Sequence, residues 1–401
     1  MRRKRLVLSI CASLCVVLIG IVVAVVFLSP KHTHKLSESR TYHISNSSIY
    51  YTRACAKGCE IKYQEDITIV DLFASVRAQD KIVLDENVVL NEELVLKGFS
   101  GEQELDLNIN LDLNNFRLSS NVSNKNYNSL FMLNANRGSI KLNISNGHLY
   151  SNDLLYIFRF SNNGEMGGDI ELNLNKVNCE VLGNRATPLY AQGTVSTTRD
   201  GTISMTNALM KINATNSKFI STCANHNYGA DCDYCGVGAF INSASDFNFT
   251  NCEFFGGDGV FVKQGNLNLT NCKLANSALV PPTTLTAQRS SDFDAVGASL
   301  LVDNYTTSEG TTKFNIVIKN CIMNSDSGKG IYVVETADEG LELAVNSESF
   351  IDVQSCGVAK VNPIEDLSVH PVVDYADYKG YDSTNQVFVF GDMNFANIGC
   401  Y

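Results

Sequence analysis

Apolar and polar residues alternate in short segments along most of the chain. INLDLNNFRL (109–118), ELNLNKVNCEVL (171–182) and LNLTNCKLA (267–275) share one form, in which alternating apolar residues lead to an Asn, commonly a Cys, and an apolar residue two places on. Alternation with a period of two predicts strands that bury one face. The same form recurs in five further segments, at 140–149, 210–220, 247–255, 314–323 and 348–358.

A second kind of apolar strand lies between these segments. GVGAFI (236–241), GDGVFV (257–262), VGASLLV (296–302) and GKGIYV (328–333) are examples. Repeat units of about 20 to 50 residues are typical of solenoids, in which successive coils stack strand on strand about 4.8 Å apart. The pattern therefore predicts an all-β chain that winds as a solenoid.

The recurring Asn predicts a ladder where one strand bends into the next. Asn tolerates the left-handed conformation, and its side-chain amide can hydrogen-bond the Asn of the next coil. We expect this role, at an interior bend, for Asn178, Asn251, Asn271 and Asn320.

An amphipathic helix is predicted in front of the repeats. TIVDLFASVRAQDKIVL (68–84) places Val70, Leu72, Phe73 and Val76 on one helical face and continues into a strand. A solenoid needs such a cap to cover the core and the open strand edge of its first coil. With the repeated units, this helix-then-strand start resembles the right-handed parallel β-helix, or pectin-lyase-like, superfamily over about residues 65 to 360. The resemblance implies the fold and not the function, because that architecture carries polysaccharide lyases, hydrolases and esterases as well as adhesins and spikes.

The first 28 residues predict a membrane anchor. MRRKR (1–5) precedes 23 uncharged residues (6–28), which as a helix can cross a hydrocarbon layer of about 30 Å. A cleaved signal peptide is the alternative, although its apolar core usually has about 7 to 15 residues. The basic start places the N-terminus in the cytoplasm and everything after the anchor outside, at a cell surface or on a viral envelope.

These segments predict the organisation of the whole chain. It comprises a cytoplasmic basic tail (1–5), a transmembrane anchor (6–28), a linker with Cys55 and Cys59 (29–64), a parallel β-helix (65–361), and a C-terminal loop and capping segment (362–401).

The net charge and the glycosylation motifs indicate which classes of partner to expect. The formal net charge is −11, and the basic residues form no stripe beyond the first positions, so nucleic acid is not expected as a partner. Asn-x-Ser/Thr sequons are frequent, although a chain rich in Asn, Ser and Thr produces several by chance. They lie at Asn46, Asn121, Asn143, Asn213, Asn248, Asn268 and Asn304.

The chain has 13 cysteines, which divide by position. Those beside the ladder are expected to be unpaired core thiols, because neighbours about 4.8 Å apart exceed the mean Cβ separation of about 3.8 Å in a disulfide. They are Cys179, Cys252, Cys272, Cys321 and Cys356.

The disulfide candidates are Cys55, Cys59, Cys223, Cys232 and Cys235. The last three, with His226, could instead hold zinc. A single Cys-x-x-Cys in an oxidising space favours disulfides, so no metal site is predicted.

Few residues are candidates for catalysis. Asp258, Asp294 and Asp326 with Lys329 lie close to the Gly-containing strands, where stacking could bring them onto one edge. GGDGVF and NSDSGKGI faintly resemble paired-Asp segments of polygalacturonase-like hydrolases. No adjacent Asp pair, Gly-His-Gly or Arg-x-Lys segment accompanies them where that family carries its remaining catalytic groups. We therefore assign no catalytic residue and expect these acids to sit apart as solvated turn residues.

The sequence thus favours a surface protein over an enzyme. Tyr375, Tyr378 and Tyr381 recur every third residue beside acids, an arrangement that suits sugar binding and equally a C-terminal segment that packs its Tyr rings over the last coil. We expect a membrane-anchored β-helix that acts as an adhesive or structural stalk, or binds glycans or surface proteins. The alternative is a membrane-tethered polysaccharide lyase or glycoside hydrolase. No cofactor is expected, apart from calcium if the protein is a lyase.

Overall fold

The structure is a computed structural model. It describes residues 35–101, 103–120, 129–135, 138–152, 154–161, 168–183, 186–192, 196–197, 203–204, 210–222, 236–276, 298–307, 310–325, 329–337, 340–342, 349–354, 356–359, 373–375, 378–382, 387–390 and 393–396. The predicted membrane anchor (6–28) lies outside these ranges. Within them, no helix has the length and apolar character needed to span a membrane.

The chain divides into two units. One comprises Met1–Glu38 and Arg53–Ile61, and the other comprises Ser39–Thr52 and Lys62–Tyr401. In the described part of the first unit, the Ser37 N–H donates to the Ala54 carbonyl over 2.8 Å, and Leu36 forms a β-bridge with Cys55. The rows of strands described next belong to the second unit.

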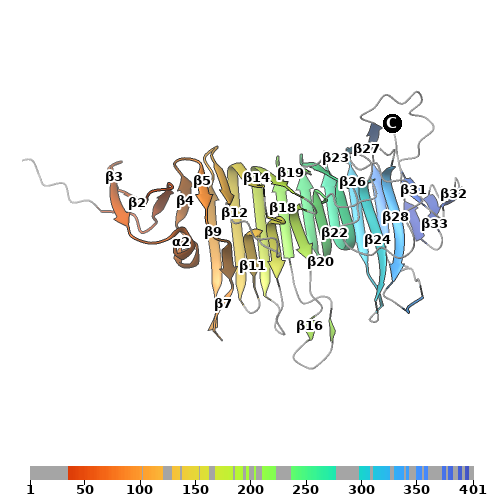
Figure 1. The fold of residues 1–401 in the computed structure, drawn as a ribbon, viewed down its shortest axis with the longest axis horizontal. Helices are drawn as coiled ribbons and strands as arrows, with labels where there is room; N and C mark the ends of the chain where they lie inside the picture. Colours follow the sequence, from red (N-terminus) through yellow and green to blue (C-terminus); the bar gives the residue numbers. More distant parts are fainter. Residues whose placement is uncertain are drawn as a thin grey trace, which may run out of the picture. The chain divides into compact units, whose positions relative to one another are not determined.

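Parallel pairing dominates the second unit. Nearly all its strands join one mostly parallel sheet, in which a strand pairs with its counterparts in the preceding and following repeats. The pairings sort the strands into three rows, and Figure 1 shows strands of the first row side by side. The all-β prediction is confirmed, and this pairing is compatible with a solenoid.

Row 1 carries the segments in front of the recurring Asn. It contains β4 (Lys81–Leu84), β9 (Asp106–Asp112), the first part of β12 (Ser139–Ser151) and of β14 (Asp169–Leu182), β18 (Met210–Thr215), the last part of β20 (Ala239–Thr250) and of β22 (Val260–Thr270), β26 (Phe314–Lys319) and β29 (Phe350–Gln354).

Rows 2 and 3 follow in each repeat. Row 2 contains β5 (Val88–Leu90), β10 (Arg117–Ser120), the last part of β12 and β14, β19 (Lys218–Thr222), β21 (Glu253–Gly256), β23 (Lys273–Asn276), β27 (Ile322–Ser325) and β30 (Gly357–Ala359). Row 3 contains β6 (Leu94–Lys97), β11 (Ser129–Asn134), β13 (Tyr156–Ser161), β15 (Thr187–Gln192), the first part of β20 and β22, β24 (Ala298–Thr307), β28 (Lys329–Ala337) and β31 (Val373–Tyr375).

Alternation within row 1 builds the core. Every second side chain points inward and lies beside its counterpart in the next repeat, so apolar residues form continuous columns. One such column, fully buried throughout, consists of Ile109, Leu142, Leu172, Ile212, Phe247, Leu267, Ile316 and Ile351. Burying each side chain contributes about 1.5–3 kcal/mol.

The bend between rows 1 and 2 depends on left-handed residues. Asn216, Asn251, Asn271 and Asn320 have φ between 52° and 54°. The Asn271 amide donates to Asn251 Oδ1 over 3.2 Å, and the Asn251 amide donates to Asn216 Oδ1 over the same distance. Asn is tolerated here because its short polar side chain can hydrogen-bond locally.

Two details of the predicted ladder need correction. The bend asparagines Asn251, Asn271 and Asn320 are exposed and not interior, since the bend turns their side chains outward. Asn178 is not at a bend: it pairs with Lys218 inside row 2, and Lys176, with φ 57°, takes the left-handed position of that repeat.

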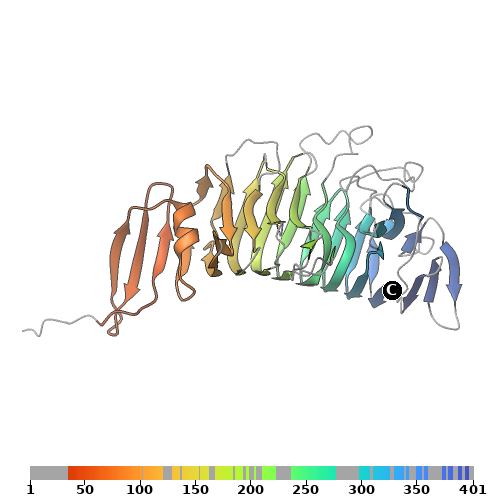
Figure 2. The ribbon, with the colours of Figure 1, turned by 90° about the horizontal axis from the view of Figure 1, so that it is seen from below.

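The predicted cap is a short helix, α2 (Ile69–Ser75). Thr68 caps it by accepting the Asp71 N–H over 3.1 Å, and Leu72 and Phe73 are buried. The Phe73 ring lies 6.2 Å from Phe131 of row 3, so the helix covers the core at that end. Figure 2 shows the helix beside the first strands of the stack.

Residues assigned to a linker form strands instead. β1 (Thr41–Ile44) pairs in parallel with β4 of row 1 and antiparallel with β2 (Ile49–Ala54), which pairs with β3 (Glu60–Glu65). Tyr42 and Ile44 of β1 are buried and extend the core beyond the first repeat. At the other end, the described parts of the predicted capping segment form β31, β32 (Tyr378–Asp382), β33 (Val387–Phe390) and β34 (Met393–Ala396), and Ala396 pairs with Asp352 of row 1.

The left-handed bend leads to a stability prediction. Asn271→Leu should lower the free energy of unfolding by about 1–2 kcal/mol, because a branched apolar residue is strained at positive φ. Asn271→Gly removes the same amide hydrogen bonds without that strain and should cost less. Thermal melts of both variants provide the measurement, and equal losses would mean that hydrogen bonding, not backbone conformation, governs the bend.

A polar groove on the outer face of row 1

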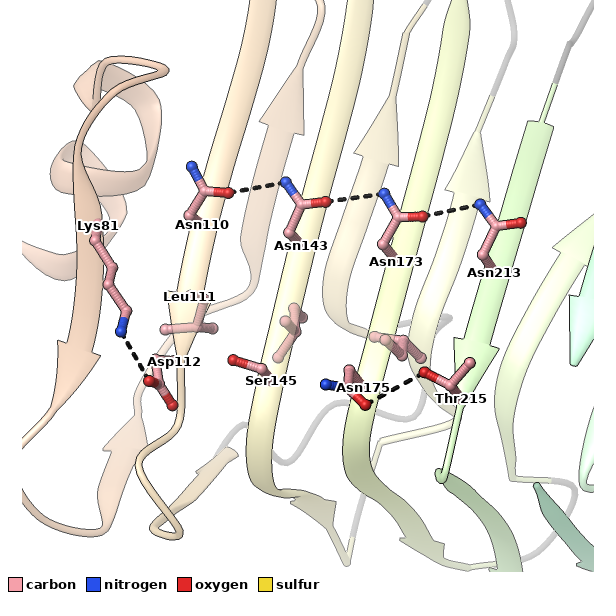
Figure 3. Close-up of a pocket in the computed structure, with 12 residues that line it drawn as sticks. Lys81, Asn110, Leu111, Asp112, Asn143, Ser145, Asn173, Asn175, Asn213 and Thr215 are labelled. Atoms are coloured by element: carbon pink, nitrogen blue, oxygen red, sulfur yellow. Dashed lines mark hydrogen bonds and ion pairs between the residues drawn. The ribbon is translucent and has the colours of Figure 1, made fainter. Parts of the chain in front are cut away.

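The outward positions of row 1 carry a second asparagine ladder. Six asparagines occupy paired positions in successive repeats: Asn110, Asn143, Asn173, Asn213, Asn248 and Asn268. From Asn143 onward, each side-chain amide donates to the side-chain Oδ1 of the Asn before it in the ladder, over 2.8–3.1 Å. Figure 3 shows the first four of these side chains in line. Identical amides match the strand spacing of about 4.8 Å, so each amide partners its neighbours.

A column of smaller polar residues runs beside this ladder. Asp112, Ser145, Asn175 and Thr215 are paired in register, and the Thr215 hydroxyl donates to Asn175 Oδ1 over 3.3 Å (Figure 3). The first four asparagines of the ladder and this column line a groove of about 310 Å³, together with Leu111, Ile144 and Leu174. Its walls therefore present amide and hydroxyl groups at the regular spacing of the strands, within a lining that is mostly apolar.

An ion pair closes one end of the groove. Lys81 Nζ lies 2.8 Å from Asp112 Oδ2. Burial opposes ionisation of Asp112, but hydrogen bonds from Lys81, the Asn114 N–H and the Asn146 amide hold its pKa below the usual value. The carboxylate is therefore charged and already paired.

Charged residues follow the other side of the ladder. Lys141 Nζ lies 3.1 Å from Glu171 Oε1, and the Asn173 amide donates to the same oxygen over 2.9 Å. The hydrogen bond from Asn173 and the contact with Lys141 lower the pKa of Glu171, against a smaller effect of burial. These pairs tie the ladder to its charged neighbours and hold the amides in place.

Of the four catalytic candidates, Asp258 alone has its side chain within the described residues. Asp258 was expected to be a solvated turn residue, but it is fully buried, and Oδ1 accepts the Ala298 N–H over 2.8 Å. This carboxylate joins the segment before β22 to the start of β24, a structural role. Asp294 and Asp326 lie outside the described residues, as does the side chain of Lys329, whose backbone begins β28.

The tyrosine candidates lie on strands. Tyr375 ends β31, and Tyr378 and Tyr381 belong to β32, which pairs antiparallel with β33. Their side chains are outside the described part of the structure.

The cysteine candidates are described only in part. Cys223, Cys232 and Cys235 lie outside the described residues. Cys55 and Cys59 flank a tight turn, in which the Cys55 N–H donates to the Cys59 carbonyl over 2.7 Å. The neighbouring Cys55 thiol raises the pKa of Cys59. Across the described ranges, no three His, Cys, Asp or Glu side chains converge as metal ligands.

The groove was not predicted from the sequence, although a repeated sequence pattern marks it. In LNLTNC and FNFTNC, the Asn between two apolar residues occupies the outward ladder, whereas the Asn before Cys occupies the bend. The first of these asparagines was noted only as a sequon. The repeated apolar-Asn-apolar triplet could have identified it.

Comparison with known proteins gives no relative. The sequence matches no protein-family model and no curated protein, and the structure matches no solved structure.

The outward ladder leads to a prediction about glycosylation. Asn143, Asn213, Asn248 and Asn268 are both sequon and ladder residues. A glycan replaces one amide N–H, and glycans on neighbouring repeats would start only about 4.8 Å apart. In folded protein produced through a secretory pathway, glycopeptide mass spectrometry should find these four sites unoccupied.

The exposed sequon at Asn46 lies outside the ladder and is the comparison site within the same sample. Its amide also donates, to the Asn87 carbonyl over 2.7 Å, so it controls for the loss of a hydrogen bond without the crowding of the ladder. Glycans on two neighbouring ladder positions of folded protein would contradict the arrangement of the amides.

Proposed function

We propose that the chain is a membrane-anchored surface protein whose β-strand region is a right-handed parallel β-helix that binds glycans through the groove on row 1. The three parallel rows and the like-on-like columns support the β-helix. The uncharged segment 6–28 after MRRKR supports the anchor, with the N-terminus in the cytoplasm. The region then presents the groove outside the membrane as an adhesive element or stalk.

The observation that carries this proposal is the hydrogen-bonded asparagine ladder beside a column of hydroxyl and amide groups. Amides and hydroxyls both donate and accept, so they complement a ligand that is itself rich in hydroxyl groups. The side chains of the ladder are already ordered by one another. A ligand would therefore bind without the entropic cost of fixing flexible side chains.

The same groove argues against the enzymatic alternative. Glycoside hydrolysis requires two carboxyl groups on either side of the scissile bond. Among the residues that line the groove, Asp112 is the sole carboxylate, and Lys81 pairs with it. The buried position of Asp258 likewise removes one of the candidate acids from contact with a polymer.

Glycan binding can be tested with the purified full chain on an array of neutral and acidic oligosaccharides. Thr215→Val and Asn175→Leu remove groove hydrogen bonds without touching the ladder, and each should weaken binding roughly 2- to 10-fold at about 0.5–1.5 kcal/mol per hydrogen bond. Thr270→Val is the matched control, because Thr270 occupies the same column two repeats beyond Thr215, outside the groove. Binding that is absent, or insensitive to all three changes, would refute the role of the groove.

The proposed topology is tested separately. Protease added to intact cells should digest the chain from about residue 35 onward and leave a membrane-bound fragment containing residues 6–28, because the positive charges keep the start inside. N-terminal sequencing of the mature protein is the second measurement. A mature chain that begins near residue 30 would show that the segment is a cleaved signal peptide.

A further inference from the structure

Four cysteines form a column inside the bend between rows 1 and 2. Cys252, Cys272 and Cys321 directly follow the bend asparagines, and Cys356 lies at the same place in the last described repeat. The Lys273 N–H donates to the Cys252 carbonyl and the Ile322 N–H to the Cys272 carbonyl, each over 2.9 Å. The cysteines are therefore neighbours in successive repeats.

The four thiols are free and buried, and each residue is 1% exposed. Each thiol donates to a backbone carbonyl of its own bend, as Cys252 Sγ does to Thr250 and Cys272 Sγ to Thr270 over 3.4 Å. The Cys272 N–H also donates to Cys321 Sγ over 3.4 Å, so a sulfur atom of one repeat reaches the backbone of the repeat before it. The column is thus a row of buried thiols in successive repeats.

Cys179 does not belong to this column. It lies in row 2, two positions beyond the column, between Leu149 and Phe219, which corrects its predicted place beside the ladder. It has no cysteine neighbour in that row, and burial alone raises its pKa.

Strand spacing decides which chemistry fits the column. Side chains on neighbouring strands are separated by about 4.8 Å, whereas a disulfide needs Cβ atoms about 3.8 Å apart. A cation bound linearly between two thiolates separates their sulfur atoms by twice the metal–sulfur distance, which is about 4.6 Å with the zinc–sulfur distance of about 2.3 Å as a guide and is close to the strand spacing. Zinc does not fit, because its structural sites need four converging ligands and no three converge within the described ranges.

We propose that the column of Cys252, Cys272, Cys321 and Cys356 binds soft monovalent cations of the Cu(I) class, each between thiolates of adjacent repeats. Soft thiolate ligands select Cu(I). Each ion replaces two thiol protons, which pass to solvent, so two S–H bonds break, two S–Cu bonds form and no electron is transferred. Four thiols in a row hold two ions.

Two double variants test this arrangement, because they remove the same number of thiols from different places. Cys272→Ser with Cys321→Ser leaves Cys252 and Cys356 three repeats apart, about 14 Å by strand spacing, so no pair remains. Cys252→Ser with Cys356→Ser leaves the adjacent middle pair. Serine is compatible with the site, since Ser217 is buried at the equivalent bend position one repeat earlier.

The purified full chain is titrated without oxygen with Cu(I) buffered by a competing chelator, and bound copper is counted by native mass spectrometry. Cysteines elsewhere in the chain are the same in all variants, so the difference in the number of bound copper ions reports on the column alone. Relative to the native protein, the middle variant should lose two ions and the outer variant one. X-ray absorption of the outer variant should show two sulfur ligands for the copper held by the middle pair.

Folding is checked by the far-ultraviolet circular dichroism of each variant. If the middle variant does not fold, the loss of one ion in the outer variant still tests the proposal. Equal copper content in the native protein and the folded outer variant would overturn it, as would equal losses in both variants.

Discussion

In-register stacking of parallel strands is the constraint on which this structure depends. Each strand lies beside its counterpart in the next repeat, so inward apolar residues lie beside apolar residues and the ladder asparagines beside asparagines. A single repeat cannot bury its inward apolar face alone, whereas stacked repeats share a continuous core. The helix α2 and strand β1 extend that core at the start, where the first repeat would otherwise expose it.

The same constraint gives repeated residues different roles according to their place in the repeat. The Asn at the bend is selected by backbone conformation, since its φ is positive and its side chain is exposed. The Asn three residues earlier is selected by its amide, which hydrogen-bonds the amides of both neighbouring repeats. The Cys after the bend faces inward, where stacking brings thiols together that are 20 to 49 residues apart in the sequence. A ladder of amides outside and a row of thiols inside thus arise from one short motif.

Position within the stack also determines which charges are available for function. Asp112 lines the groove and Glu171 lies beside the asparagine ladder, yet each is engaged by a lysine and by amide hydrogen bonds. Asp258 is fully buried and accepts the Ala298 N–H. The amides and hydroxyls of the groove are not committed to such ion pairs, and the proposal of glycan binding rests on them.

The sequence by itself determined the periodic features. Alternating apolar residues predicted the strands, the recurring Asn predicted the left-handed bend at Asn251 and Asn271, and the apolar positions around Leu72 and Phe73 predicted the capping helix. These features are local, because each depends on residues within a few positions of one another. Only the tertiary structure decided that Lys176 replaces Asn178 at one bend, that residues 41–44 add a strand in front of the first repeat, and that Asp258 is buried against Ala298. Those outcomes depend on which residues stacking brings together across about 30 to 50 positions of the sequence. Asp258 and Ala298, for example, are 40 positions apart. No local pattern in the sequence encodes that register.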